Sequence, residues 1–152
     1  MRSSQSVTVN APPHVVFPFV DSLDRYPAWL PLVHNVEVTE SAQGEVGPAW
    51  MVEIRARVGP FARSKRLRML RTAHVDGRVA EFERAELDGR EHARWAMLAE
   101  LTETGDGSTT LTMHLAYDGA LWGGALLERV LDEEIKRGRT GLASLVRDSP
   151  IR

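Results

Sequence analysis

The sequence predicts an α+β fold, in which a seven-stranded antiparallel sheet precedes a long C-terminal helix within one domain, residues 1–152. Short apolar runs with a two-residue period follow one another between glycine-containing turns, which is typical of a meander of antiparallel strands. The last part of the chain instead carries apolar residues at helical spacing. Strands followed by a separate helix favour the α+β class over an alternating α/β class.

The chain begins with an expected strand over residues 4–10, where apolar and polar residues alternate. Asn10 is expected to cap the following helix, with Pro12 and Pro13 in its first turn. Two short helices are expected between the first and second strands, because prolines interrupt the apolar segments there. The interrupting prolines are Pro18, Pro27 and Pro31.

The next strands are predicted from alternating residues after His34 and on both sides of a turn at Gly59-Pro60. If this turn pairs Val58 with Phe61, the same register brings apolar side chains together across two strands. A slip by one residue would turn these side chains to the solvent, so their agreement supports the register. The predicted pairs are Val52 with Leu67 and Trp50 with Met69.

The hairpin around which the chain is organised is predicted at Asp76-Gly77, a preferred dipeptide of two-residue type I′ turns. This turn would pair Val75 with Arg78. Two arginines, Arg71 and Arg84, then fall on the apolar face of the hairpin. The predicted pairs are Met69 with Arg84 and Arg71 with Phe82.

The last two turns are predicted at Asp88-Gly89 and at Gly105-Asp106-Gly107. Asp88-Gly89 is expected to form a two-residue turn, and Gly107 is expected to be left-handed in a three-residue hairpin. Both registers keep the apolar residues on the same face as in the earlier hairpins. The predicted pairs are Leu87 with Arg90, Phe82 with Trp95, Ala80 with Met97, Arg84 with Ala93, Leu101 with Leu111, Ala99 with Met113, Met97 with Leu115, and Trp95 with Tyr117.

A long C-terminal helix is predicted from about Leu121 to Val146. Its glycines weaken it as an isolated helix, so we expect packing against the sheet to stabilise it. The apolar stripe consists of Leu126, Leu127, Val130, Leu131, Ile135, Leu142 and Leu145, and the glycines are Gly123, Gly124, Gly138 and Gly141.

The composition excludes several classes of function. The chain has no cysteine, which excludes disulfides, thiolate catalysis and cysteine metal sites and fits a cytoplasmic location. The net charge is −2 and no long basic run is present, so we expect no nucleic-acid partner. No stretch approaches the length of a membrane span. We expect a monomer or a homodimer.

The face opposite to the apolar one carries a stripe of basic residues next to acidic ones. We interpret this stripe as a solvated charge lattice, in which each exposed pair contributes about 0–1 kcal/mol. The basic residues are Arg55, Arg57, Arg66 and Arg68, and the acidic ones are Glu53, Glu81 and Glu83.

The segments VTVNAPPHVVFPFV and LDRYPAWLPLV, followed by the glycine-bearing long helix, resemble the START/polyketide-cyclase superfamily (SRPBCC), which has the helix-grip fold. The superfamily includes lipid-transfer, birch-pollen-allergen-like and aromatase/cyclase members. The resemblance covers about the whole chain and concerns structural motifs. It implies a curved seven-stranded sheet that wraps the C-terminal helix and leaves an apolar cavity between them.

The cavity that the resemblance implies would be lined by the predicted inward face of the sheet. Sheets covered by a single helix often leave room for a ligand, and apolar side chains with a few polar groups are typical of such sites. An ordinary solid core is the alternative. The candidate ligand-binding residues are Trp50, Val52, Ile54, Leu67, Met69, Phe82, Trp95, Met97, Met113 and Leu115.

The candidate catalytic residues are Arg71, Arg84 and Tyr117. Aromatase/cyclases of the superfamily place arginines thirteen residues apart on these two strands, and the spacing from Arg71 to Arg84 matches. The guanidinium groups would bind an enolate or carboxylate oxygen, and Tyr117 would move a proton. Alternatively, the arginines reach water or pair with Glu86 or Glu134.

Two functions therefore remain open. In the first, the protein binds a hydrophobic or aromatic small molecule, of lipid, quinone or polyketide type, and performs no chemistry. In the second, it is a polyketide aromatase/cyclase that promotes aldol cyclisation and dehydration of a poly-β-keto chain. His34 is expected near the mouth of the cavity, and the spacing of the histidines predicts no metal site and no cofactor.

Overall fold

The computed structural model describes residues 2–58, 60–118 and 124–148, with side chains at all of these except 58, 124–128 and 131. One antiparallel sheet has the strand order β1-β7-β6-β5-β4-β3-β2. Three short helical segments connect β1 to β2, and one long helix follows β7. The elements are β1 Arg2–Val9, α1 Pro13–Val16, η1 Phe17–Phe19, η2 Leu23–Ala28, β2 Val33–Thr39, β3 Ala49–Val58, β4 Phe61–Val75, β5 Val79–Arg84, β6 Trp95–Glu103, β7 Thr109–Tyr117 and α2 Gly124–Arg147.

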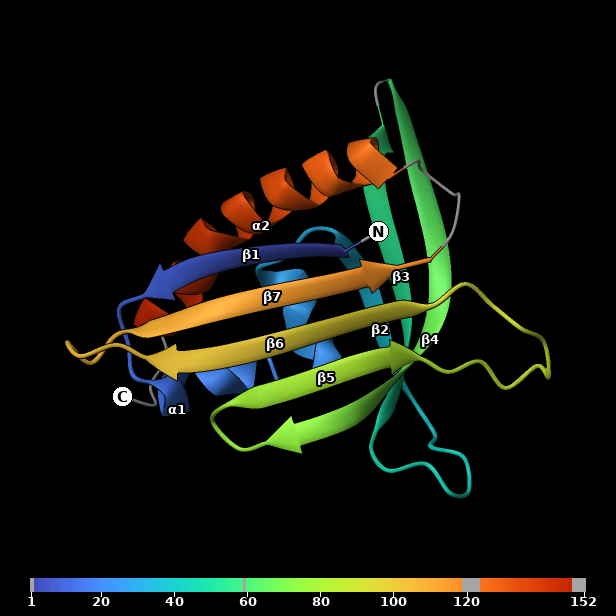
Figure 1. Cartoon of the computed structure of the whole chain (residues 1–152), viewed down its shortest axis with the longest axis horizontal. Coiled ribbons are helices and arrows are strands. Elements are labelled where there is room, and N and C mark those ends of the chain that lie inside the picture. The colour runs from blue at the N-terminus through green and yellow to red at the C-terminus, as the bar shows by residue number, and fades with distance from the viewer. Residues whose placement is uncertain (1, 59, 119–123, 149–152) are drawn as a thin grey trace.

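The sheet is strongly bent, so that β3 and β4 run across the direction of β1, β6 and β7 (Figure 1). The long helix α2 extends from the β3 end of the bend along β1, and the short helices lie below it. The apolar residues of the strands point to this side. The architecture is the helix-grip fold that the sequence predicts.

The first helix is not capped as expected. Pro12, in extended conformation, is its N-cap residue, and no side chain caps the helix. The Asn10 carboxamide oxygen instead accepts a hydrogen bond from the Ser108 hydroxyl at 3.3 Å. Because the prolines preset the backbone dihedral of the first turn, the helix can begin without a side-chain cap. Pro18 and Pro27 interrupt the helices as predicted, and the interrupted segments are 3₁₀ helices.

The predicted pairing of β3 with β4 is confirmed from Val58–Phe61 through Trp50–Met69. The pairing of β6 with β7 is also confirmed over its whole length, and Gly107 is left-handed with φ +84°. Glycine adopts the left-handed conformation at little steric cost, which explains the three-residue hairpin at this point.

The turn at Asp76-Gly77 differs from the prediction. A type I′ turn needs positive φ at both central residues, and only Gly77 has it. Val75 consequently pairs with Val79 rather than with Arg78. An irregularity between Arg71 and Ala73 compensates for this difference. The predicted pairs Arg71–Phe82 and Met69–Arg84 therefore form after all.

The predicted pairing of β5 with β6 is wrong by two residues. Phe82 pairs with Met97 rather than with Trp95, because residues 85–94 form a loop and not a two-residue hairpin. The Asp88 carboxylate accepts a hydrogen bond from the backbone N–H of Arg90 at the tip of this loop. A shift of two residues keeps every side chain on its face, so the apolar set remains inward.

The helix α2 packs through small residues against the end of η2. Ile135, Leu142 and Val146 are buried, and the predicted positions Leu126, Leu127 and Leu131 lie outside the described side chains. A Cβ atom at Gly138 would lie 3.0 Å from the Trp29 carbonyl oxygen, and one at Gly141 would lie 3.3 Å from its Cα atom. The glycines therefore permit the close approach on which the helix depends.

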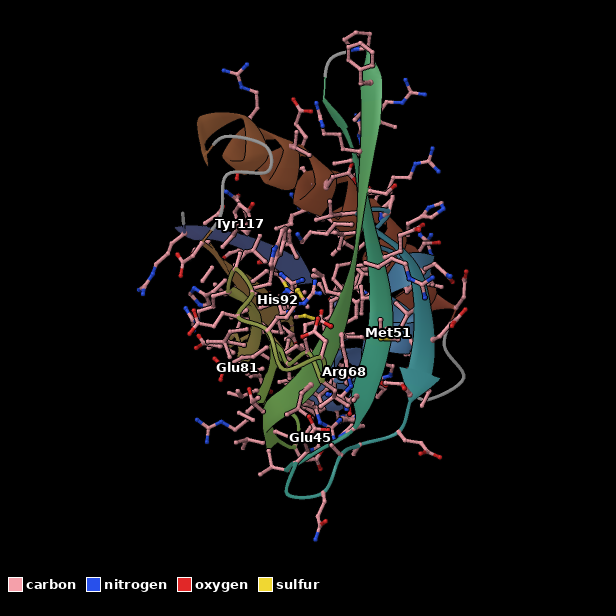
Figure 2. All side chains as sticks on the ribbon, turned by 90° about the vertical axis from the view of Figure 1, so that its right-hand side faces the viewer. Glu45, Met51, Arg68, Glu81, His92 and Tyr117 are labelled. Atoms are coloured by element: carbon pink, nitrogen blue, oxygen red, sulfur yellow. The ribbon has the colours of Figure 1, made fainter. Side chains whose placement is uncertain are left out.

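Arg68 on the outer face of β4 is not solvated as expected, because the loop between β2 and β3 covers it (Figure 2). Both of its terminal nitrogens donate to the Glu45 carboxylate, at 2.7 and 2.6 Å. They also donate to the backbone oxygens of Ala85 and Glu40, at 2.9 and 3.0 Å. The hydrogen bonds from Arg68 hold the pKa of Glu45 at about 2. One guanidinium thus fastens two loops to the sheet.

Replacement of the Glu45 carboxylate should expose the cost of this burial. We expect Glu45→Gln to lower the free energy of unfolding by about 3–5 kcal/mol near neutral pH, because it leaves Arg68 buried without its counterion. The matched control is Glu37→Gln, at an exposed position of β2.

Since the folded-state pKa of Glu45 is depressed, the contribution of this carboxylate to the free energy of unfolding is complete above the ordinary pKa of about 4.3 and is lost as the pH falls through about 2. Denaturant titrations at several pH values measure both effects, and equal stability of the two variants would contradict the assignment.

Candidate functional site

A hollow of about 410 Å³ lies between α2 and the edge of β3. β2 leaves this edge uncovered because its first residue, Val33, pairs with Ile54, and Pro31 has no N–H with which to continue the ladder. The lining residues are Pro31, His34, Arg55, Ala56, Arg57, Ala62, Val130, Glu133, Glu134 and Arg137. The hollow thus combines small apolar residues with a charged rim.

Glu134 is the most unusual residue of this hollow. Its Oε1 atom accepts from Arg137 at 3.3 Å, whereas its buried Oε2 atom has no hydrogen-bond partner among the described residues. A buried carboxylate oxygen without a donor is costly, and such an atom in a hollow is a candidate ligand contact. Glu134 was not among the predicted ligand contacts, although a carboxylate beside Val130 and Ile135 on the apolar stripe of the helix is a usable signal.

His34, the second residue of β2, lies at the hollow. Its Nε2 atom is 3.7 Å from the Glu53 carboxylate, and its side chain is about half exposed. The ring therefore belongs to the rim of the hollow and not to its floor. Within the described residues, no group of three or more histidine, aspartate or glutamate side chains is placed to hold a metal ion.

The predicted ligand-binding residues lie on the inner face of the sheet, beyond the hollow. Ala56 is buried at the hollow, and residues of the same strand face continue from it every second position. All ten predicted residues are buried except Leu115, which is half-buried. The structure pairs Val52 with Leu67, Trp50 with Met69, Phe82 with Met97, and Met97 with Leu115, and it pairs Met113 with Ala99.

Part of this inner face is filled by the protein itself. The Tyr26 ring lies 6.1 Å from the Phe82 ring and 4.9 Å from the Trp29 ring, and Phe82 lies 5.7 Å from Trp50. The Tyr26 hydroxyl donates to the Val20 carbonyl at 2.7 Å, and burial raises the pKa of this phenol well above its usual range. The short helices therefore fill the end of the sheet near Phe82.

The two inward arginines each hold a connecting segment. Arg71 is half-buried, and its Nη1 atom donates to the backbone oxygen of Asp21 at 2.9 Å. Arg84 is nearly buried, and it pairs with Glu86 at 3.1 Å and donates to the backbone oxygen of Ala93 at 3.2 Å. The pairing of Arg84 with Glu86 is the structural alternative that the sequence left open.

Tyr117, the third predicted catalytic residue, is buried at the end of β7. Its ring centroid lies 4.5 Å from that of Trp95 on the neighbouring strand. The pair follows from the confirmed register of β6 and β7, which places both rings on the inner face. Tyr117 is therefore close to Trp95, and it comes from a different part of the sheet than Arg71 and Arg84.

Half of the residues that line the hollow are charged, and none of the ten predicted ligand-binding residues lines it. The hollow provides polar groups at its rim, and the inner face behind it provides buried apolar surface. The volume of the hollow falls within the range of about 300–1,000 Å³ that is common for ligand sites, although such sites usually have a more apolar lining. In the part of the chain that is described, no helix is long and apolar enough to cross a membrane.

Comparison with solved structures finds the same fold in several proteins. A START superfamily protein from Mycobacterium smegmatis has a TM-score of 0.72 at 14% identity, and 96% of this chain and 97% of that chain are covered. The ZhuI aromatase/cyclase from Streptomyces sp. R1128 has a TM-score of 0.66 at 16% identity, with 97% and 93% covered. A protein from Thermus thermophilus has a TM-score of 0.68 at 17% identity, with 98% and 100% covered.

These identities show a shared fold alone. No curated protein matches the sequence. The model of one family, described as polyketide cyclase / dehydrase and lipid transport, matches residues 1–147 and thus nearly the whole chain. Together with the bent seven-stranded sheet and the glycine-bearing helix α2, this match shows that the chain belongs to the polyketide cyclase / dehydrase and lipid transport family.

Proposed function

We propose that the protein binds an apolar or aromatic small molecule between the inner face of the sheet and α2. The observation that carries this proposal is the hollow at the edge of β3, where the charged rim adjoins the buried strand face that begins at Ala56. The apolar body of the ligand lies against Ile54 and Leu67, and its polar end lies at the rim. The family, whose description includes lipid transport, supports this choice.

Glu134 supplies the polar contact in this proposal. Its Oε2 atom is an acceptor without a donor among the described residues, so a ligand hydroxyl or amide N–H would satisfy it. The ligand class is therefore an apolar or aromatic molecule with a hydrogen-bond donor at one end. Arg55 and Arg57 provide cations at the same rim for an additional acidic group.

A polyketide aromatase/cyclase activity is the second candidate. The solved ZhuI structure is an aromatase/cyclase of the same fold, and the family description includes polyketide cyclase and dehydrase. In this proposal Arg71 and Arg84 would stabilise enolate oxygens of a poly-β-keto chain, and Tyr117 would move a proton. Both arginines already donate to backbone oxygens, which favours the binding function over the catalytic one.

Blocking the hollow should reduce binding of a neutral apolar probe. We expect Ala62→Trp to weaken binding of N-phenyl-1-naphthylamine about tenfold, or ~1.4 kcal/mol, because an indole at this exposed lining position covers the opening. The control is Ser64→Trp, which is exposed on the same strand and does not line the hollow. Fluorescence titration measures both affinities. Equal affinities of the two variants would place the ligand elsewhere, and extraction of the purified protein followed by mass spectrometry would identify a retained ligand.

Removal of the Glu134 carboxylate should affect stability and binding in opposite directions. We expect Glu134→Leu to raise the free energy of unfolding by about 1–3 kcal/mol, because it removes a buried acceptor without a partner. The same variant should bind 2-naphthol about tenfold more weakly, and naphthalene with unchanged affinity. Glu37→Leu, at an exposed position of β2 that does not line the hollow, is the control. A loss of stability in the Glu134 variant would show that the carboxylate has a structural partner.

Substitution of the inward arginines tests the cyclase. If the protein cyclises a poly-β-keto chain supplied by a minimal polyketide synthase, Arg71→Ala and Arg84→Ala should each lower formation of the aromatic product by about 10²–10³. Arg66→Ala, at an exposed position of β4, is the control, and thermal unfolding of each variant identifies loss of the fold. Full turnover by both variants would exclude these arginines from catalysis. If the wild type forms no product, the cyclase activity is excluded and only the binding function remains.

A further inference from the structure

The hairpin of β3 and β4 extends beyond α2 and away from the rest of the molecule (Figure 1). Between residues 55 and 66 the sequence contains five basic residues and no acidic one, although the net charge of the chain is −2. The projecting hairpin is thus a local concentration of positive charge. The five residues are Arg55, Arg57, Arg63, Lys65 and Arg66.

The charges of this hairpin are available to an external partner. All five side chains are exposed except that of Lys65, which is half-buried. No ion pair between described residues involves any of them, and the nearest acidic residue along β3 is Glu53, which lies opposite Arg66 at the base of the hairpin. The expected lattice of ion pairs is therefore not found among the described residues of this hairpin, and its outer part is cationic.

An apolar aromatic residue lies at the end of this cationic segment. Phe61, the first residue of β4, is 67% exposed, and the neighbouring Pro60 is also exposed. Burial of this ring in an apolar environment would be favourable, and its position at a projecting tip beside the cations would allow insertion into a lipid surface. Arg57 and Arg63 flank it on the two strands. An apolar tip followed by a belt of cations matches the order of acyl chains and anionic headgroups in a lipid surface.

The position of the hairpin relative to the hollow favours a lipid surface over a nucleic acid. Arg55, Arg57 and Ala62 belong both to the hairpin and to the lining of the hollow. A surface that holds the tip therefore lies next to the opening. Bilayers dissolve apolar molecules, so docking there would bring the opening to a supply of ligand.

We propose that the tip of the β3–β4 hairpin docks on an anionic lipid surface, with Phe61 inserted among the acyl chains and the flanking arginines on the headgroups. This inference rests on the proposed binding function and adds the source of its ligand. Each arginine near an anionic surface contributes about a fivefold increase in affinity. Docking is consequently weakened by salt and by loss of single cations.

The full-length protein should sediment with vesicles of phosphatidylcholine mixed with phosphatidylserine, and not with vesicles of phosphatidylcholine alone. The variant Phe61→Ser/Arg63→Gln should lose about tenfold or more in vesicle affinity. The matched control is Leu87→Ser/Arg90→Gln, which removes one exposed apolar residue and one cation from the loop between β5 and β6. This control should bind as the wild type does.

Binding of N-phenyl-1-naphthylamine separates this inference from the proposed function. If the probe binds but neither the wild type nor the control sediments with anionic vesicles, docking is overturned and the binding function stands. If vesicles bind but the probe does not, the binding function fails. Equal loss in the two double variants, equal binding to both vesicle types, or binding to a short duplex DNA in place of vesicles would each overturn the docking proposal.

Discussion

One face of a single seven-stranded sheet must be buried, and the rest of the structure depends on this constraint. Because the side-chain period of a strand is two residues, a register may shift by two without harm, whereas a shift by one would expose the apolar set. The sheet shows this tolerance at β5–β6, where Phe82 pairs with Met97. At β4–β5 the irregularity between Arg71 and Ala73 compensates for an altered turn.

The helix α2 covers only part of this face, and the short helices cover another part. Gly138 and Gly141 bring α2 against Trp29, and Tyr26 from the same segment reaches Phe82 on the sheet. The aromatic contacts fill the end of the sheet near β5. The hollow lies at the opposite end, where β2 begins only at Val33 and leaves the edge of β3 uncovered.

Arg68 and Glu134 are charged residues that the fold withdraws from solvent in different ways. Arg68 has four hydrogen bonds from its terminal nitrogens and fastens two loops to the outer face, as a structural ion pair should. Glu134 has a buried oxygen without a donor among the described residues, and it lies in a hollow. The satisfied Arg68 is a structural residue, whereas the unsatisfied oxygen of Glu134 is a candidate ligand contact.

The sequence alone determined the order of β2 to β7, the inward face and three of the hairpin registers along most of their length, because these follow from the two-residue period and from glycine-containing turns. Only the tertiary structure decided which inward residues are core and where the hollow lies. These depend on Pro31 at the edge of β3 and on the contact of Trp29 with α2, which join distant segments. The burial of Arg68 was likewise decided only by the tertiary structure, since the local alternation of residues does not reveal that a loop folds over a strand.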